Sequence, residues 1–99
     1  MDNEIINKIK ELTEQVKVFL DFEKVIVFGS FSKGLANEES DIDVAFFVKE
    51  ISPSHWQLSA KLFELVDKID SRIEPIIINE KSDRSGFAKN ILEKGVIVY

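Results

Sequence analysis

The stretch that decides the fold covers residues 25–30, Val-Ile-Val-Phe-Gly-Ser, and resumes over residues 41–48, Asp-Ile-Asp-Val-Ala-Phe-Phe-Val. Each segment holds a run of apolar, mostly β-branched or aromatic residues, which predicts two buried strands. Asp41 and Asp43 are two residues apart, so their side chains lie on the same face of an extended segment. Burying unpaired charge beside an apolar strand is costly. The pattern therefore indicates a cation at the two carboxylates, and a divalent metal ion is the type that prefers such oxygen ligands.

Gly29 and Ser30 directly follow the first apolar run, where the predicted strand ends. A glycine-serine turn offers backbone N–H groups and a hydroxyl to phosphate oxygens. Ser30 is also suited to cap a following helix, and the two roles agree because a capping serine and a phosphate-binding serine occupy the same place. A phosphate-binding turn beside a pair of metal-binding carboxylates indicates a site for a metal–nucleotide complex.

The composition predicts one folded domain over residues 1–99, with 44% hydrophobic and 31% charged residues. The chain contains no cysteine, which excludes disulfide bonds and metal sites built from thiolates. No apolar run approaches the length of a membrane span, and the acidic amino terminus differs from a signal peptide. We therefore expect no membrane partner and a cytoplasmic location.

The net charge of −5 argues against general nucleic-acid binding, because contacts to phosphate backbones need clustered Lys and Arg side chains. The basic residues of this chain are scattered instead. A nucleotide bound as its magnesium complex remains compatible with an acidic protein, since the metal ion supplies the positive charge.

Apolar periodicity predicts an α+β domain, a small mixed sheet of three to four strands with flanking helices. Predicted helices cover residues 3–20, a segment that begins near residue 54, and residues 83–94. A short helix is expected over residues 30–34, before a polar loop over residues 35–40. Predicted strands cover residues 24–29, 41–49 and 72–79, and residues 96–99 either add a short strand or pack on the core.

Local signals predict how two of the helices begin or end. Ser54 and Gln57 have the spacing of a capping box, with Ser54 as the N-cap. Gly95 stands at a C′ position, where it would close the last helix. The helix that follows Ser54 is expected to bury one apolar face, made of Trp56, Leu62, Phe63, Val66 and Ile69.

The ordered set of motifs resembles the signature of the polymerase-beta-like nucleotidyltransferase superfamily. Residues 29–34, Gly-Ser-Phe-Ser-Lys-Gly, are followed by residues 40–44, Ser-Asp-Ile-Asp-Val. Glu74 fits the third carboxylate, which the family carries on a later strand. More narrowly, the chain resembles the minimal nucleotidyltransferases, small proteins often encoded beside a helical HEPN partner. The resemblance covers nearly the whole chain and implies the nucleotidyltransferase fold.

The resemblance implies that Asp41, Asp43 and Glu74 are catalytic and hold two Mg²⁺ ions, with Mn²⁺ as an alternative. Two metal ions together stabilise the attacking and leaving oxygens of an in-line displacement. Glu74 would complete the metal that activates the acceptor hydroxyl and help to take its proton. Other readings remain open: the two aspartates would cap a turn, and Glu74 would form a surface ion pair with Arg72, which contributes little.

The resemblance also assigns Gly29, Ser30 and Lys33 to the phosphates of the nucleotide. Members of the family commonly carry arginine at the positions of Phe31 and Lys33. Lys33 keeps the charge but lacks the bidentate guanidinium fork, and Phe31 has no charge at all. Both departures should lower the affinity for triphosphate. Lys33 is equally compatible with a solvated helix lysine.

The resemblance implies transfer of AMP from Mg-ATP to a hydroxyl group, a tyrosine of a HEPN toxin for which this chain would be the antitoxin. A single lobe of 99 residues leaves a second wall of the cleft to that partner or to a second copy of the chain. One alternative is a binding antitoxin that masks the toxin without chemistry. Another is an adenylyltransferase of the aminoglycoside-modifying kind, although those enzymes usually carry an added helical domain.

Overall fold

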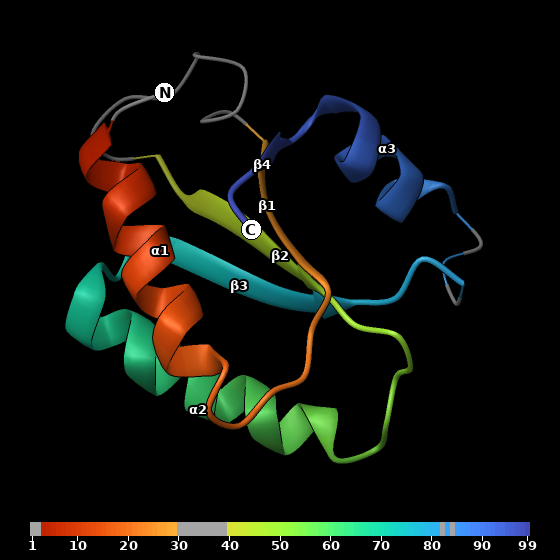
Figure 1. Cartoon of the computed structure of the whole chain (residues 1–99), viewed down its shortest axis with the longest axis horizontal. Helices are drawn as coiled ribbons and strands as arrows, with labels where there is room; N and C mark the ends of the chain where they lie inside the picture. Colours follow the sequence, from red (N-terminus) through yellow and green to blue (C-terminus); the bar gives the residue numbers. More distant parts are fainter. Residues whose placement is uncertain (1–2, 30–39, 82, 84) are drawn as a thin grey trace.

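The computed structural model describes residues 3–29, 40–81, 83 and 85–99 of the chain. It confirms the α+β class, with a four-stranded sheet and flanking helices (Figure 1). The elements in chain order are α1 (Asn3–Val16), β1 (Lys24–Phe28), β2 (Ile42–Phe47), α2 (His55–Ile69), β3 (Ile73–Ile78), α3 (Phe87–Lys94) and β4 (Val96–Ile97). Within the described ranges, no helix combines the length and the apolar character needed to cross a membrane.

The sheet has the strand order β3-β2-β1-β4. β1 pairs antiparallel with both β2 and β4, whereas β2 pairs parallel with β3. A parallel pair needs a crossover connection, and α2 provides it between β2 and β3. The start of β2, the start of β3 and the end of β1 therefore meet at one end of the sheet.

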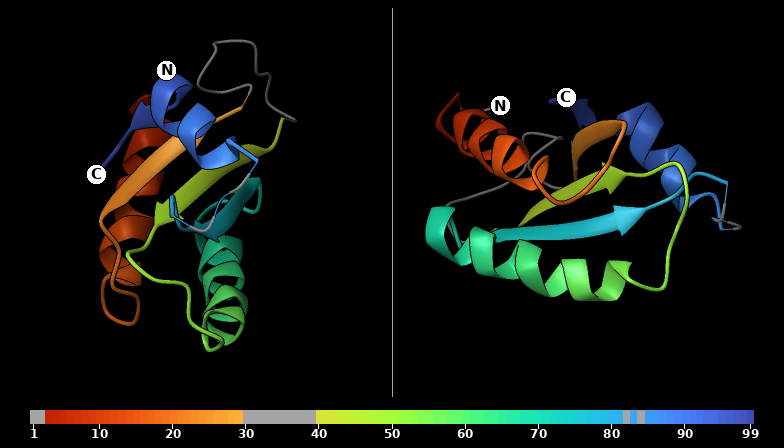
Figure 2. Two further views of the ribbon diagram at one scale, coloured as in Figure 1. Left: turned by 90° about the vertical axis from the view of Figure 1, so that its right-hand side faces the viewer. Right: turned by 60° about the horizontal axis from the view of Figure 1, so that its bottom comes forward.

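The two faces of the sheet are covered by different helices (Figure 2). On one face, α1 and α2 pack on alternate strand residues, among them Val44 and Phe46 of β2. On the other face, α3 packs on the residues between these, among them Ala45 and Phe47. Because side chains alternate along a strand, Asp43 belongs to the face that α3 covers.

Helix α1 is shorter than the segment 3–20 that the sequence predicts, because it ends at Val16. The amide of Leu20 still donates to the Val16 carbonyl at 2.9 Å, so the chain turns back toward the core there. Leu20 is buried, but Val18 is 86% exposed. Leu20 thus reaches the core through a turn after the helix rather than through a further helical turn, and Val18 does not reach it.

The predicted buried face of α2 is wrong for Trp56 and Phe63, which are 72% and 49% exposed. Leu62 and Val66 are buried, and Ile69 packs against the same core. These three residues define the inner stripe of the helix, and Phe63 stands about 100° around the helix axis from Leu62. Trp56 and Phe63 are seven residues apart, so they share an outer face.

Ser54 and Gly95 stand at the predicted helix ends, but the predicted capping box and C′ glycine are wrong in form. Ser54 has helical backbone angles and makes no capping bond, and its hydroxyl pairs with the Ser52 hydroxyl at 2.8 Å. Gly95 ends α3 with an extended backbone, φ −79°, rather than a left-handed one. Space is what requires glycine at residue 95, because an added Cβ would overlap Ile26 and lie 2.6 Å from the Ile91 carbonyl oxygen.

Candidate active site

The structure brings Asp41, Asp43 and Glu74 to one end of the sheet. Asp41 directly precedes β2, and Asp43 is the second residue of that strand. Asp43 pairs with Glu74 in the parallel register of β2 and β3. Paired residues of neighbouring strands project from the same face, and Asp41 shares that face through the two-residue period. The third carboxylate is therefore on the same side of the sheet as the first two, as predicted.

The charge of Asp41 acts on the other two carboxylates of the site. Burial, together with the charge of Asp41, raises the pKa of Asp43. The pKa of Glu74 is raised by Asp41 first, then by partial desolvation and by Asp43. Both shifts have the sign expected for negative charges held close together.

The alternative reading of Glu74 as a surface partner of Arg72 does not fit this electrostatic pattern. A neighbouring guanidinium would lower the pKa of a carboxyl, whereas the pKa of Glu74 is raised. The guanidinium of Arg72 instead forms an ion pair with Asp70, with Nη2 2.7 Å from Oδ2. The sequence interpretation did not identify Asp70. The available signal was its position at the predicted end of a helix, two residues before an arginine.

Gly29 links the end of β1 to the carboxylate pair. Its φ of +75° is a conformation that residues with a Cβ rarely adopt. A Cβ added there would also lie 2.5 Å from Oδ2 of Asp43. Glycine at this position therefore has two physical causes, the turn itself and the close approach of the Asp43 carboxylate. Ser30 and Lys33, the other predicted phosphate ligands, lie outside the described residues.

The donor set fits a hard divalent cation. Three carboxylates offer only oxygen ligands, the type that Mg²⁺ and Mn²⁺ prefer, and a bound cation would offset their mutual repulsion. Among the residues that the structure describes, no group of three or more His, Cys, Asp or Glu side chains is arranged to hold a metal ion. The assignment of Asp41, Asp43 and Glu74 as ligands thus stays a proposal, supported by shared face, register and charge.

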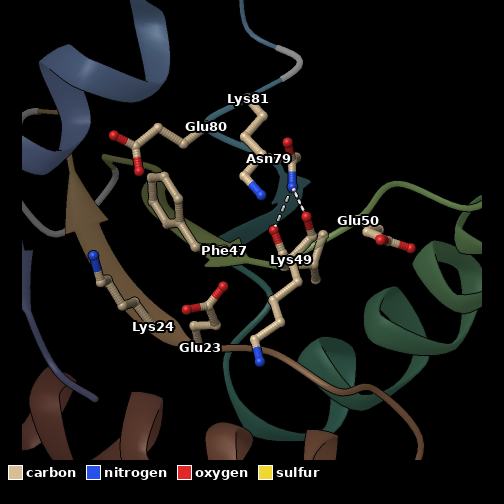
Figure 3. A pocket seen from close by; sticks show the side chains of 9 residues that line it. Glu23, Lys24, Phe47, Lys49, Glu50, Asn79, Glu80 and Lys81 are labelled. Carbon is tan, nitrogen blue, oxygen red and sulfur yellow. Dashed lines mark hydrogen bonds between the residues drawn. The ribbon is translucent and has the colours of Figure 1, made fainter.

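A cavity of about 420 Å³ lies at the opposite end of the sheet (Figure 3). It is lined by the start of β1, by the end of β2 with the residues that follow it, and by the segment after β3, including Lys24, Phe47 and Lys81. Asn79 closes one side, where its Nδ2 donates to the carbonyls of Val48 and Lys49 at 2.6 and 2.5 Å. Phe47 is four positions after Asp43 in β2, roughly 13 Å along the strand. The cavity is therefore distinct from the carboxylate site, and no motif of the sequence predicts it.

In the absence of a metal ion, the protein is expected to become more stable as the pH falls from neutrality toward 4.5, the ordinary pKa of Glu74. The pKa values of Asp43 and Glu74 are raised above 3.8 and 4.5, so the folded state binds more protons than the unfolded state in this window. Stability contributed by such groups is lost as the pH rises through the raised values. Thermal unfolding in the presence of a chelator measures the trend.

The Asp43→Asn variant provides the control, because it should flatten this pH dependence. Asp70 and Asp83 are the same in both proteins, and the stability that their lowered pKa values contribute is lost only as the pH falls toward and below 3.8. A melting temperature that rises steadily with pH in the unmutated protein, with the same slope in the variant, would contradict the proposed repulsion.

The sequence is similar to known proteins along nearly its whole length. The family model described as "Polymerase beta, Nucleotidyltransferase" matches residues 7–99. A protein of Methanocaldococcus jannaschii, provisionally named a protein adenylyltransferase, is 34% identical over 101 residues. The alignment covers 96% of this chain and 99% of the relative.

Solved structures share the fold. A toxin–antitoxin complex with AMP-PNP contains a chain with a TM-score of 0.65 and 23% identity, over 95% of this chain and 72% of that chain. A tri-AMPylated Shewanella oneidensis HEPN toxin in complex with an MNT antitoxin gives a TM-score of 0.57 and 21% identity, over 95% and 68% of the two chains. At these identities the likeness bears on the fold, and the sequence match over residues 7–99 shows that the chain belongs to the polymerase-beta nucleotidyltransferase family.

Proposed function

We propose that this protein transfers AMP from Mg-ATP to a hydroxyl group, and that the acceptor is a tyrosine of a HEPN-type toxin. One observation carries the proposal: Asp43 and Glu74 are in register on adjacent strands, with Asp41 on the same face. The structural neighbours support the partner class, since one is an MNT antitoxin in complex with an AMPylated HEPN toxin. The relative provisionally named a protein adenylyltransferase supports a protein acceptor.

The arrangement assigns a separate task to each part of the site. The acceptor oxygen forms a bond to the α-phosphorus of ATP, the bond to the β-bridging oxygen breaks, and pyrophosphate leaves. Asp41 and Asp43 would hold two Mg²⁺ ions, which when bound stabilise charge on the attacking and leaving oxygens. Gly29 lets the backbone of the turn approach the phosphates, which Ser30 and Lys33 would also contact.

Glu74 is the carboxylate best placed to take the proton of the acceptor hydroxyl. It is exposed and belongs to β3, the strand at one edge of the sheet, so an acceptor can reach it from outside. The raised pKa of Glu74 makes it a better base than an ordinary carboxylate once it is ionised. The acceptor is therefore expected to approach from the β3 edge.

The experiment that tests the proposal is incubation of the protein with labelled ATP, Mg²⁺ and a HEPN-type protein encoded beside it. We expect the label to appear on a tyrosine of that partner and to require Asp41 and Asp43. The departures at Phe31 and Lys33 favour a second candidate, a binding antitoxin that masks its toxin. Masking without chemistry is supported if Asp41→Asn/Asp43→Asn protein neutralises the toxin as well as the unmutated chain does.

Magnesium at about ten times its dissociation constant is expected to raise the melting temperature of the protein by roughly 6–11 °C. The physical reason is that the ion binds the folded state, in which Asp41, Asp43 and Glu74 share one face, and not the unfolded chain. The Asp41→Asn/Asp43→Asn variant should show no such increase. An equal increase in the melting temperature of the variant would mean that the ion binds at a site other than Asp41 and Asp43.

A further inference from the structure

The carboxylate of Asp70 lies between two cationic side chains from different elements. Asp70 follows the last residue of α2, and its side chain is only 8% exposed. Its Oδ1 and Oδ2 accept hydrogen bonds from Nε and Nη2 of Arg72 at 3.0 and 2.7 Å, which is a bidentate pair. Nζ of Lys8, on α1, donates to Oδ2 at 3.1 Å.

The same carboxylate fixes the turn between α2 and β3. The Asp70 amide donates to the Val66 carbonyl at 2.8 Å, which closes the last turn of α2. Its Oδ1 accepts the Arg72 amide at 3.0 Å, and its carbonyl accepts the Ile73 amide at 3.1 Å. Asp70, Ser71 and Arg72 are the whole connection, so the path of the chain into β3 is set by these bonds.

The connection between α2 and β3 also sets the position of Glu74. The carbonyl of Arg72 accepts the amide of Ile42 at 2.8 Å. Ile42 stands between the two aspartates, and the pairing continues with Asp43 opposite Glu74. A slip of one residue at this point would move Glu74 to the opposite face of the sheet.

We propose that Asp70 is a positioning residue for the transfer reaction. Through its contacts with Arg72 and Lys8, it fixes the turn that holds Glu74 opposite Asp43. Asp70 belongs to the turn and not to the carboxylate face, so it acts through Glu74 rather than on the substrate. The inference rests on the proposed function, because it assigns the residue to that same site. Its geometric part, the register of β2 and β3, can be tested without any activity.

The first test is steady-state kinetics of AMP transfer by the Asp70→Asn variant. Asparagine keeps an oxygen for the Arg72 amide but removes the charge that two cations share. We expect kcat to fall about tenfold or more, with KM for Mg-ATP unchanged within about threefold, because a displaced Glu74 affects the chemical step rather than nucleotide binding. Glu14→Gln is the matched control, since it removes the exposed ion pair between Glu14 and Lys17, both 50 or more residues before β3 in sequence.

The second test is hydrogen exchange of single amides, read by NMR. The amide of Ile42 should exchange about tenfold faster in Asp70→Asn than in the unmutated protein, while amides of β1 keep their rates. If Asp70 contributes only to stability, the variant melts at a lower temperature and its kcat per folded molecule is unchanged. Amide exchange then accelerates equally at Ile42 of β2 and in β1. That result would overturn the proposal.

Two further measurements separate the remaining outcomes. If the unmutated protein transfers no AMP, the proposed function fails, and the exchange rate of Ile42 alone decides whether Asp70 sets the register. If Asp70→Asn does not fold, the Lys8→Gln variant replaces it, because it removes only one of the two cations that contact Asp70. Its kcat and its Ile42 exchange rate then test the proposal. Unchanged kcat and unchanged Ile42 exchange in Lys8→Gln would then count against the proposal.

Discussion

Replacement of Asp43 by asparagine is expected to lower the rate of AMP transfer by roughly a thousandfold or more, while the protein stays folded. A metal ion contributes several kcal/mol of charge stabilisation in such a displacement, and each 1.36 kcal/mol corresponds to about a factor of ten. Asparagine is isosteric but lacks the negative charge, so it should weaken binding of the proposed ion without leaving a cavity. Asp41→Asn should have a similar effect, because Asp41 directly precedes β2 and shares the side of the sheet to which Asp43 belongs.

The measurement is single-turnover transfer of label from ATP to the proposed HEPN-type acceptor, with circular dichroism to verify the fold. Asp67→Asn is the matched control, because Asp67 is an exposed acid on α2. Transfer by that control should equal transfer by the unmutated protein. Near-normal transfer by Asp43→Asn would remove Asp43 from the proposed ligands.

The central strands could be predicted from the sequence because their residues are almost all apolar. The apolar runs before Gly29 and after Asp43 are continuous, and such runs are typical of strands that are covered on both faces. Their predicted ranges, residues 24–29 and 41–49, contain β1 and β2 completely. Family membership also followed from these segments, since the glycine-serine pair and the two aspartates flank them.

The outer face of α2 could not be predicted in the same way. Apolar residues occur on more than one side of this helix, so periodicity alone leaves two candidate faces. The packing of α1 and of the sheet selects the side that carries Leu62 and Val66. Trp56 and Phe63 stand outside that contact, and no local pattern distinguishes them from core residues.

The role of Asp70 depends on contacts between distant residues. Its partner Lys8 is 62 residues away in the sequence, and the β2–β3 register that follows from the turn is a tertiary property. The assignment of Gly95 shows a related limit. The sequence indicates that glycine ends α3, but only the packing against Ile26 explains why a larger residue would not fit.

Gly29→Ala is expected to lower AMP transfer about a hundredfold and to destabilise the fold by about 1–2 kcal/mol. The loss of stability arises because alanine is strained at a φ of +75°. The loss of activity has another cause, the overlap of the new Cβ with the Asp43 carboxylate, which must move to relieve a separation of 2.5 Å. A displacement of about 1 Å in a reacting geometry can cost roughly a factor of a hundred.

Gly86 offers a control that separates strain from displacement. Its φ is +82°, close to that of Gly29, but an added Cβ would meet no atom within 4 Å. Gly86→Ala should therefore lose a similar 1–2 kcal/mol or so of stability and keep normal transfer and magnesium binding. Chemical denaturation gives the stability of both variants, and label transfer gives the activity. Equal activity in the two alanine variants would mean that the turn at Gly29 does not position Asp43, because both carry the same backbone strain and only one of them moves the carboxylate.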